Sequence, residues 1–131
     1  MSQASFVSSV HALAREEWNA LTGADFPFLR HEFLAALEDS ASVGGASGWA
    51  AHHLVLHAGA RLLAVMPCYL KTHSYGEYVF DWGWAEAYQR NGLDYYPKLL
   101  SAVPFTPVPG PRLLAPDDAL RRVLLDAVAA F

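Results

Sequence analysis

The strongest constraint on the fold is a pair of apolar runs in the middle of the chain, residues 49–57 and 61–70. Both are rich in strand formers, and Ala58-Gly59-Ala60 between them is typical of a short hairpin turn. Residues 62–66 are apolar throughout, which predicts a strand covered on both faces. Pro67 cannot donate to a sheet ladder, so it should mark a bulge or the end of pairing.

Helical spacing of apolar residues predicts helices on both sides of this hairpin. A first helix should end near Leu21, with Thr22-Gly23 as the stop and a short strand at residues 6–9 before it. A second helix should begin at Pro27 and end near Ser40, and residues 41–48 should form a flexible loop. Asp117 should cap a last helix. The apolar stripe of that helix consists of Leu120, Val123, Leu124, Ala127, Val128 and Phe131.

Shorter elements should follow the hairpin. The pattern predicts a third strand at residues 75–81, a helix at 84–90 capped by Asn91-Gly92, a strand or helix at 99–103, an extended proline-rich piece at 104–111 and a strand at 112–114. The whole chain, residues 1–131, then reads as one α/β (α+β) domain with a mixed, mostly antiparallel sheet flanked by helices.

Charge and cysteine content exclude several classes of function. The net charge is −4 with no basic run, so we expect no direct nucleic-acid binding by this segment. A single cysteine cannot form an internal disulfide, and neither a signal peptide nor a long apolar span is present, which favours a cytoplasmic protein without membrane insertion.

Metal and nucleophile chemistry find little support in the sequence. His53 and His57 would share a strand face about 13 Å apart at roughly 3.3 Å per residue, too far for one zinc ion, and His52 would point to the other face. We therefore expect no metal site. Cys68 follows Pro67 in an apolar strand and is better explained as a buried, inert thiol than as a nucleophile.

The candidate site lies in residues 69–112, which hold all six tyrosines and two of the four tryptophans. If residues 75–81 form a strand, Glu77 and Asp81 share one face, with Lys71 and His73 at its mouth. Such a cluster could bind a polar substrate or take a proton from an attacking amine. The alternative is that both carboxylates are solvated or cap neighbouring backbone.

A second group of side chains lies further along the same region. Tyr95, Tyr96 and Lys98 could form a ligand-binding edge or the wall of the core. Residues 104–112 are stiff, and they could order around a ligand at little entropic cost or serve as a crossover beneath the last helix.

Three blocks of sequence resemble a known family. They are FPFLRHEFLAALEDS, GWAAHHLVL and YLKTHSYGEYVFDWGWAEAYQRNGLDYYPKLLSAVPFTPVPGPRLL, within residues 26–114. They resemble the bacterial FemAB-like, peptidoglycan-biosynthesis-related branch of the GNAT acyltransferase superfamily. KTHSYGEYVFD and YYPKLLSAVPFTPVPGPR are the most specific parts. The resemblance implies a GNAT-like sheet and the N-terminal unit of a longer protein, cut inside its last helix before a second GNAT-like unit.

The resemblance also implies which substrate this unit would bind. The full-length protein would take acyl-CoA or an aminoacyl-tRNA as donor. The Q/R-x-x-G-x-G/A turn that holds acyl-CoA in GNAT folds does not occur in this sequence, so we expect no cofactor in this chain. This unit would form the substrate groove for an amine-bearing, cell-wall-related acceptor. Glu77 and Asp81 would position the acceptor or transfer a proton. The substrate-binding residues would be Lys71, His73, Tyr95, Tyr96, Lys98 and Arg112.

We thus expect the substrate-groove half of a Fem-like acyl or aminoacyl transferase, inactive without a C-terminal GNAT-like partner domain. The alternative is a non-catalytic interaction or dimerisation module. Only 17% of the residues are charged, which favours an apolar face for a partner, and no C-cap closes the last helix.

Overall fold

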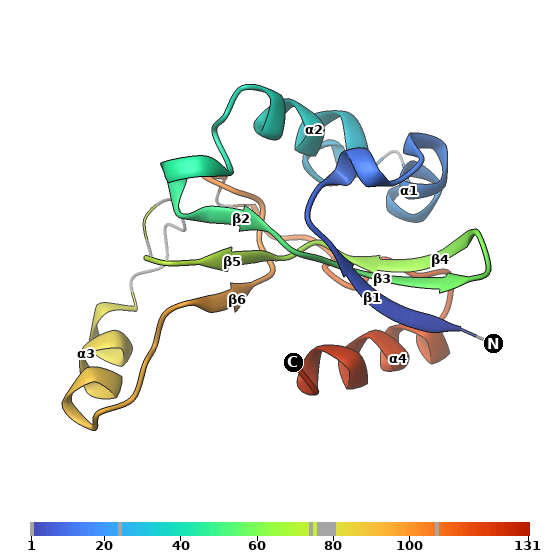
Figure 1. Cartoon of the computed structure of the whole chain (residues 1–131). Helices are drawn as coiled ribbons and strands as arrows, with labels where there is room; N and C mark the ends of the chain where they lie inside the picture. Colours follow the sequence, from blue (N-terminus) through green and yellow to red (C-terminus); the bar gives the residue numbers. More distant parts are fainter. Residues whose placement is uncertain (1, 24, 74, 76–80, 107) are drawn as a thin grey trace.

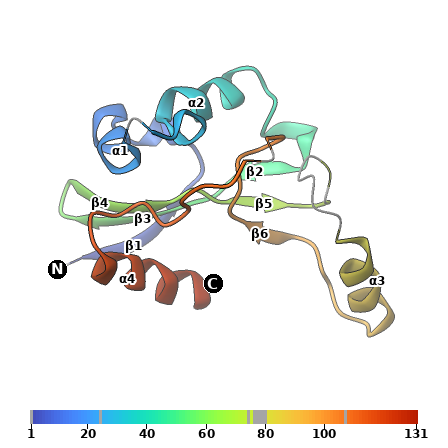
Figure 2. The same cartoon turned by 180° about the vertical axis from the view of Figure 1, so that it is seen from behind.

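The protein was analysed as a computed structural model, which describes residues 2–23, 25–73, 75, 81–106 and 108–131. Helices α1 (Arg15–Thr22) and α2 (His31–Asp39) cover one face of a strongly twisted antiparallel assembly of strands. Helix α4 (Asp118–Ala129) covers the opposite face, and α3 (Trp82–Arg90) stands apart at the far end (Figure 1; Figure 2). The expected mixed α+β fold with an antiparallel sheet flanked by helices is confirmed.

The central hairpin is present and divides into two halves. Strand β3 (His53–Ala58) pairs with β4 (Arg61–Met66) across a tight turn at Gly59, whose φ is 59°. Further from the turn, β2 (Trp49–Ala51) pairs with β5 (Tyr69–Lys71). The hairpin therefore contributes strands to two three-stranded sheets.

Two outer strands complete these sheets. Strand β1 (Gln3–Val7) pairs with β3, and β6 (Lys98–Leu100) pairs with β5, both antiparallel. The first strand thus begins and ends earlier than the predicted residues 6–9, because its register places Val7 opposite His53. The predicted strand at 112–114 is reduced to a single bridge between Leu114 and Val65.

The break between the two sheets lies where Pro67 was expected to end the pairing. The His52 N–H still donates to the Cys68 carbonyl at 3.0 Å, but the Cys68 N–H donates to Nδ1 of the His53 side chain, also at 3.0 Å. A side chain therefore replaces a backbone acceptor at this point, and the ladder is interrupted without leaving the Cys68 amide unpaired.

Alternation along the hairpin builds a core on each face of the sheet. Leu54 and Leu56 face α4, where they pack with Leu124, whereas Val55 between them faces α1 and α2. On that second face the buried cluster consists of Val10, Trp18, Leu29, Leu34, Ala35, Val55, Leu62, Val65, Val103 and Leu114. None of residues 62–66 is exposed, which confirms a strand covered on both sides.

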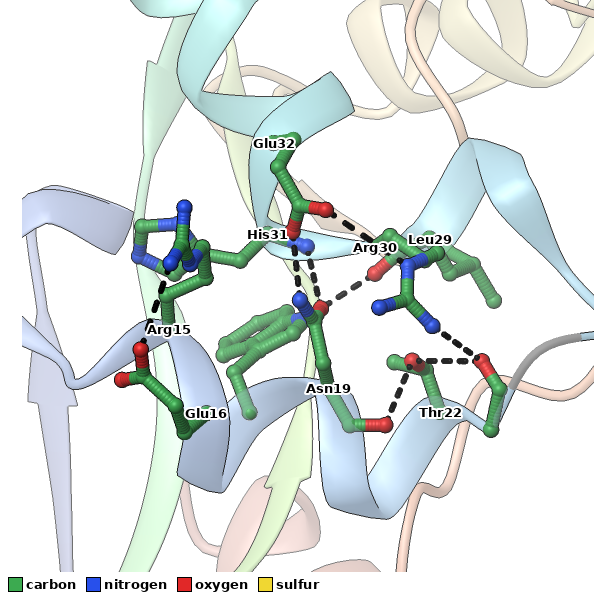
Figure 3. Close-up of polar contacts among 10 residues, drawn as sticks. Arg15, Glu16, Asn19, Thr22, Leu29, Arg30, His31 and Glu32 are labelled. Carbon is green, nitrogen blue, oxygen red and sulfur yellow. Dashed lines mark hydrogen bonds and ion pairs between the residues drawn. The ribbon is translucent and has the colours of Figure 1, made fainter.

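The predicted second helix is split. Residues Pro27–Leu29 form a separate 3₁₀ turn, and Arg30 is extended (φ −70°, ψ 151°) before α2 begins. Asn19 of α1 then supports the start of α2: its Oδ1 accepts the His31 N–H at 2.8 Å and its Nδ2 donates to the Glu32 carboxylate (Figure 3). A cap supplied from another helix is a tertiary feature, and a single-sequence pattern does not contain it.

The last helix begins as predicted. Asp117 accepts the Leu120 N–H at 2.9 Å, as an N-cap does. Leu120, Leu124, Ala127 and Val128 pack on the sheet, but Val123 is 37% exposed and lies off the buried stripe. Within the described residues, no helix has the length and apolar character needed to cross a bilayer.

Candidate substrate-binding site

A cleft of about 620 Å³ lies between α3 and β6. Its walls are formed by Asp81, Tyr88, Tyr95, Lys98 and residues 99–102. The pairing of β6 with β5 fixes the strand side of the cleft, and Asp81 at the N-cap of α3 and Tyr88 within the helix supply the other side. A helix and the strand that follows it in sequence thus meet around one opening.

A charge cluster forms the polar end of this cleft. The Lys98 ammonium and the Tyr95 hydroxyl both donate to Oδ2 of Asp81, each at 2.5 Å. The Lys98 and Asp81 side chains are only 15% and 12% exposed. Such a largely desolvated pair requires close geometry, because each charge loses hydration that only its partner can replace. The cluster is therefore fixed in place rather than a solvated surface contact.

Aromatic rings surround the Lys98 ammonium. It lies 5.3 Å from the centre of the Tyr95 ring and 5.7 Å from that of Tyr96, within the range of cation–π attraction. Tyr88 of α3 meets Tyr95 edge to face at 5.1 Å, and Tyr95 meets Tyr96 in the same way at 5.0 Å. The three rings form a stiff wall with few rotatable bonds.

The Tyr95 hydroxyl is a fixed donor. Its hydrogen bond to Asp81 raises the pKa of Tyr95 to about 12, and burial adds to the shift. The phenol therefore keeps its proton at neutral pH, and its oxygen can accept a hydrogen bond from a ligand while it donates to Asp81.

The structure brings together Asp81, Tyr95, Tyr96 and Lys98 from the predicted set. Asp81 stands at the N-cap position of α3 instead of in a strand, and Glu77 lies outside the described residues, as does most of the predicted strand at 75–81. Sequence reasoning missed Tyr88 and Ser101 as lining residues. The dense aromatic content of α3 was the only signal that could have indicated Tyr88.

Lys71 and His73 lie elsewhere. Lys71 is fully buried; its Nζ lies 3.9 Å over the Trp49 ring and donates to the Tyr75 carbonyl at 2.7 Å. Nδ1 of His73 accepts the Tyr75 N–H at 3.1 Å, and its ring rests on Gly48, whose φ of 79° and missing Cβ make room. These two side chains therefore hold the backbone at Tyr75, and their substrate contacts stay a prediction.

Arg112 lies at the edge of the cleft region. Its guanidinium donates to the carbonyls of Ser101, Val108, Gly110 and Pro111, at 3.1 to 3.3 Å. Burial lowers the pKa of the Arg112 guanidinium, which nevertheless stays charged at neutral pH. In this arrangement it fastens the proline-rich segment to Ser101, and its contact with substrate also stays a prediction.

Cys68 and His53, which the sequence also singled out, are both buried. Burial raises the pKa of the Cys68 thiol to about 11, which confirms the expected buried cysteine. Burial, with a smaller effect of His52, lowers the pKa of His53 to about 4, so its imidazole is neutral. Among the described residues, no three His, Cys, Asp or Glu side chains come together in a way that could hold a metal ion.

Comparison with known proteins shows the family to which this chain belongs. The family model described as FemAB-like, peptidoglycan biosynthesis/recognition, matches residues 9–131, and the chain therefore belongs to the FemAB-like family. The match extends beyond residues 26–114 at both ends. Membership connects the chain with peptidoglycan, the cell-wall polymer. Neither the curated proteins nor the solved structures include a significant match to this chain.

Proposed function

We propose that this chain is the acceptor-binding unit of a Fem-like acyl or aminoacyl transferase, and that its acceptor is an amine-bearing peptidoglycan precursor. The observation that carries the proposal is the desolvated Asp81–Lys98–Tyr95 cluster at the end of a cleft large enough for a few residues of peptide. Family membership supports peptidoglycan as the polymer concerned, and the cluster supports a binding site for an amine of its precursor.

The shape of the cleft favours an extended peptide. Strand β6 is the last strand in the order β2-β5-β6, and within the described residues no strand pairs with its outer edge. An extended ligand can add to such an edge through backbone hydrogen bonds. Because Asp81 and Lys98 cancel in charge, the cleft suits a peptide that carries both amine and carboxylate groups rather than a strongly charged ligand.

The chemistry assigned to Asp81 is proton acceptance. In acyl transfer the acceptor ammonium must first lose a proton. The free amine then forms a bond to the donor's carbonyl carbon, and the bond from that carbon to the donor's leaving oxygen or sulfur breaks. The Asp81 carboxylate can take that proton while Lys98 and Tyr95 hold it in position. In the proposal, the donor binds to a second unit of a longer protein.

The test is a titration with a soluble peptidoglycan stem peptide that bears a free side-chain amine, followed by calorimetry. We expect saturable binding, weakened at least about tenfold by Asp81→Asn and by acetylation of the amine. Tyr88→Phe, which keeps the ring wall, is the matched control and should bind normally. Equal binding of the acetylated and free peptides would overturn the assignment of Asp81.

A second candidate function has its own observation. Among the described residues α3 packs extensively on neither sheet, and Trp84 in this helix and Leu93 just after it are 69% and 58% exposed. Such side chains favour an interaction module that docks another protein or a second copy. Sedimentation at several concentrations separates the two functions: a monomer that binds the stem peptide supports the first, and self-association lost in Trp84→Ala supports the second.

A further inference from the structure

A second cleft, of about 640 Å³, lies away from the Asp81 cluster where the chain descends from the end of α2 to β2 (Figure 1). Glu38 of α2, Ser8 after β1, Ala51 of β2 and the backbone of residues 43–47 form its walls. Most of these positions are small or glycine. The principal charged group of the cleft is therefore the Glu38 carboxylate.

That carboxylate is held in a fixed orientation. Oε1 accepts the Ser9 hydroxyl at 2.6 Å, and Oε2 accepts the Val10 N–H at 2.9 Å. Each oxygen keeps a second lone pair for a further donor. No Lys, Arg or His pairs with Glu38 in the part of the chain that the structure describes. A half-buried carboxylate in this state can accept a cationic ligand without losing an existing partner.

Behind the cleft wall lies a buried hydroxyl that lacks a hydrogen bond. Tyr69 is fully buried, and its hydroxyl has no partner among the described residues. Tyr69 stands opposite Ala51 in the β2–β5 register, so both side chains lie on the same face of the sheet, and its ring packs in a cluster with Val43. Both neighbours line the cleft. The hydroxyl therefore lies behind the wall of the cleft, on the same face of the sheet as these two neighbours.

The backbone around the cleft is also unusual. Ala41 has a φ of 59°, rare for a residue with a side chain, and Gly44 and Gly45 have φ values of 87° and 53°. These left-handed residues bend the loop around the opening, and the Gly44 N–H to Trp49 carbonyl bond closes it at 2.5 Å. Of these residues only Ala41 is strained, and strain of this kind is often retained where a loop must enclose a ligand.

We propose that this cleft binds the primary ammonium group of a small aliphatic amine, with Glu38 as its counter-ion. An ammonium carries three hydrogen-bond donors on one compact centre. Two of them match the Glu38 carboxylate and the Ser8 hydroxyl. The third would reach the Tyr69 oxygen when the ligand enters between Val43 and Ala51. An anion would meet the Glu38 charge. This site does not depend on the proposed function, because it shares no lining residue with the Asp81 cleft.

The experiment is a ¹H–¹⁵N NMR titration of the whole chain with n-butylamine hydrochloride, with n-butanol at equal ionic strength as the neutral probe of the same length. We expect saturable shifts at the amides of Gly44, Gly45 and Ala46 with the amine and none with the alcohol. Glu38→Gln keeps an acceptor for the Val10 N–H and should weaken binding about tenfold or more.

Tyr69→Phe is the decisive second variant. It should weaken amine binding severalfold, yet unfold no more easily than the parent, because no hydrogen bond of the unliganded chain is removed. Asp81→Asn should leave the shifts unchanged, which separates this site from the proposed function. The proposal is overturned if butanol gives the same shifts, if no saturation occurs, or if Glu38→Gln binds as well as the parent. Should Glu38→Gln unfold, Glu38→Asp, which keeps the charge, must still bind.

Discussion

The two sheets of this molecule are stabilised in different ways. The β1-β3-β4 sheet has helices packed on both faces and two buried apolar clusters, whereas the β2-β5-β6 sheet has one smaller buried cluster of Val43, Trp49 and Tyr69 and ends in a charge cluster beside α3. Burial contributes roughly 1.5–3 kcal/mol for each large apolar side chain, more than a typical net hydrogen bond of about 1 kcal/mol. Stability should therefore reside in the first sheet and ligand chemistry in the second.

The largest expected effect lies in the first sheet's core. Trp18 is fully buried and its indole N–H donates to the Leu29 carbonyl at 2.8 Å, so Trp18→Ala should lower the free energy of unfolding by about 3–5 kcal/mol. Trp84→Ala, at a position 69% exposed on α3, is the matched control and should cost less than about 1 kcal/mol. Urea unfolding measures both. Similar losses would remove the contrast between the two regions.

Acid should also weaken the first sheet, through His53. Burial lowers the pKa of His53 from 6.5 to about 4, so between these pH values the unfolded chain binds a proton that the folded chain does not. At about 1.4 kcal/mol per pKa unit, the free energy of unfolding should fall by up to about 3 kcal/mol as the pH drops from 6.5 to 4, and then level off.

Unfolding curves measured at several pH values test this dependence. His53→Gln offers an acceptor to the Cys68 N–H without an ionisable ring, and it should flatten the slope between pH 6.5 and 4. An unchanged slope in His53→Gln would show that another group carries the acid dependence.

In the second sheet the charge pair should matter less. Breaking a fully buried pair costs about 3–5 kcal/mol, and since Lys98 and Asp81 keep some exposure, Asp81→Asn or Lys98→Met should each cost about 2 kcal/mol. The double variant should cost less than the two single changes added together, because neither charge is then left alone. Strict additivity in urea unfolding would argue against a coupled pair.

The smallest effect concerns Tyr95 at alkaline pH. Because the bond to Asp81 raises the pKa of Tyr95 from 10 to about 12, its stabilisation is complete below pH 10 and is lost as the pH rises from 10 to 12. It should amount to less than about 1 kcal/mol at this partly exposed site. Phenolate absorbance should show one late ionisation that Tyr95→Phe removes and Asp81→Asn shifts back toward 10.

The sequence predicted those elements that depend on neighbouring residues. The hairpin around Gly59, the interruption at Pro67, the Asp117 cap and the end of the first helix near Leu21, with Thr22-Gly23 as the stop, were all confirmed. Turn and cap residues act through their own backbone and its nearest neighbours, so they can be identified from a local pattern. The split at Arg30 was missed because Asn19, far away in sequence, caps α2.

The contacts within the candidate site, in contrast, depend on tertiary structure and could not be read from neighbouring residues. Composition singled out Asp81, Tyr95, Tyr96 and Lys98, but the sequence placed Asp81 beside Lys71, whereas the structure places it beside Lys98. The sequence by itself determined the residue types, the family and the alternating apolar pattern that makes the two-faced core. Only the tertiary structure decided which carboxylate meets which ammonium, because β6 reaches Asp81 through its pairing with β5. Contacts between separate segments are determined by packing and not by local sequence preference.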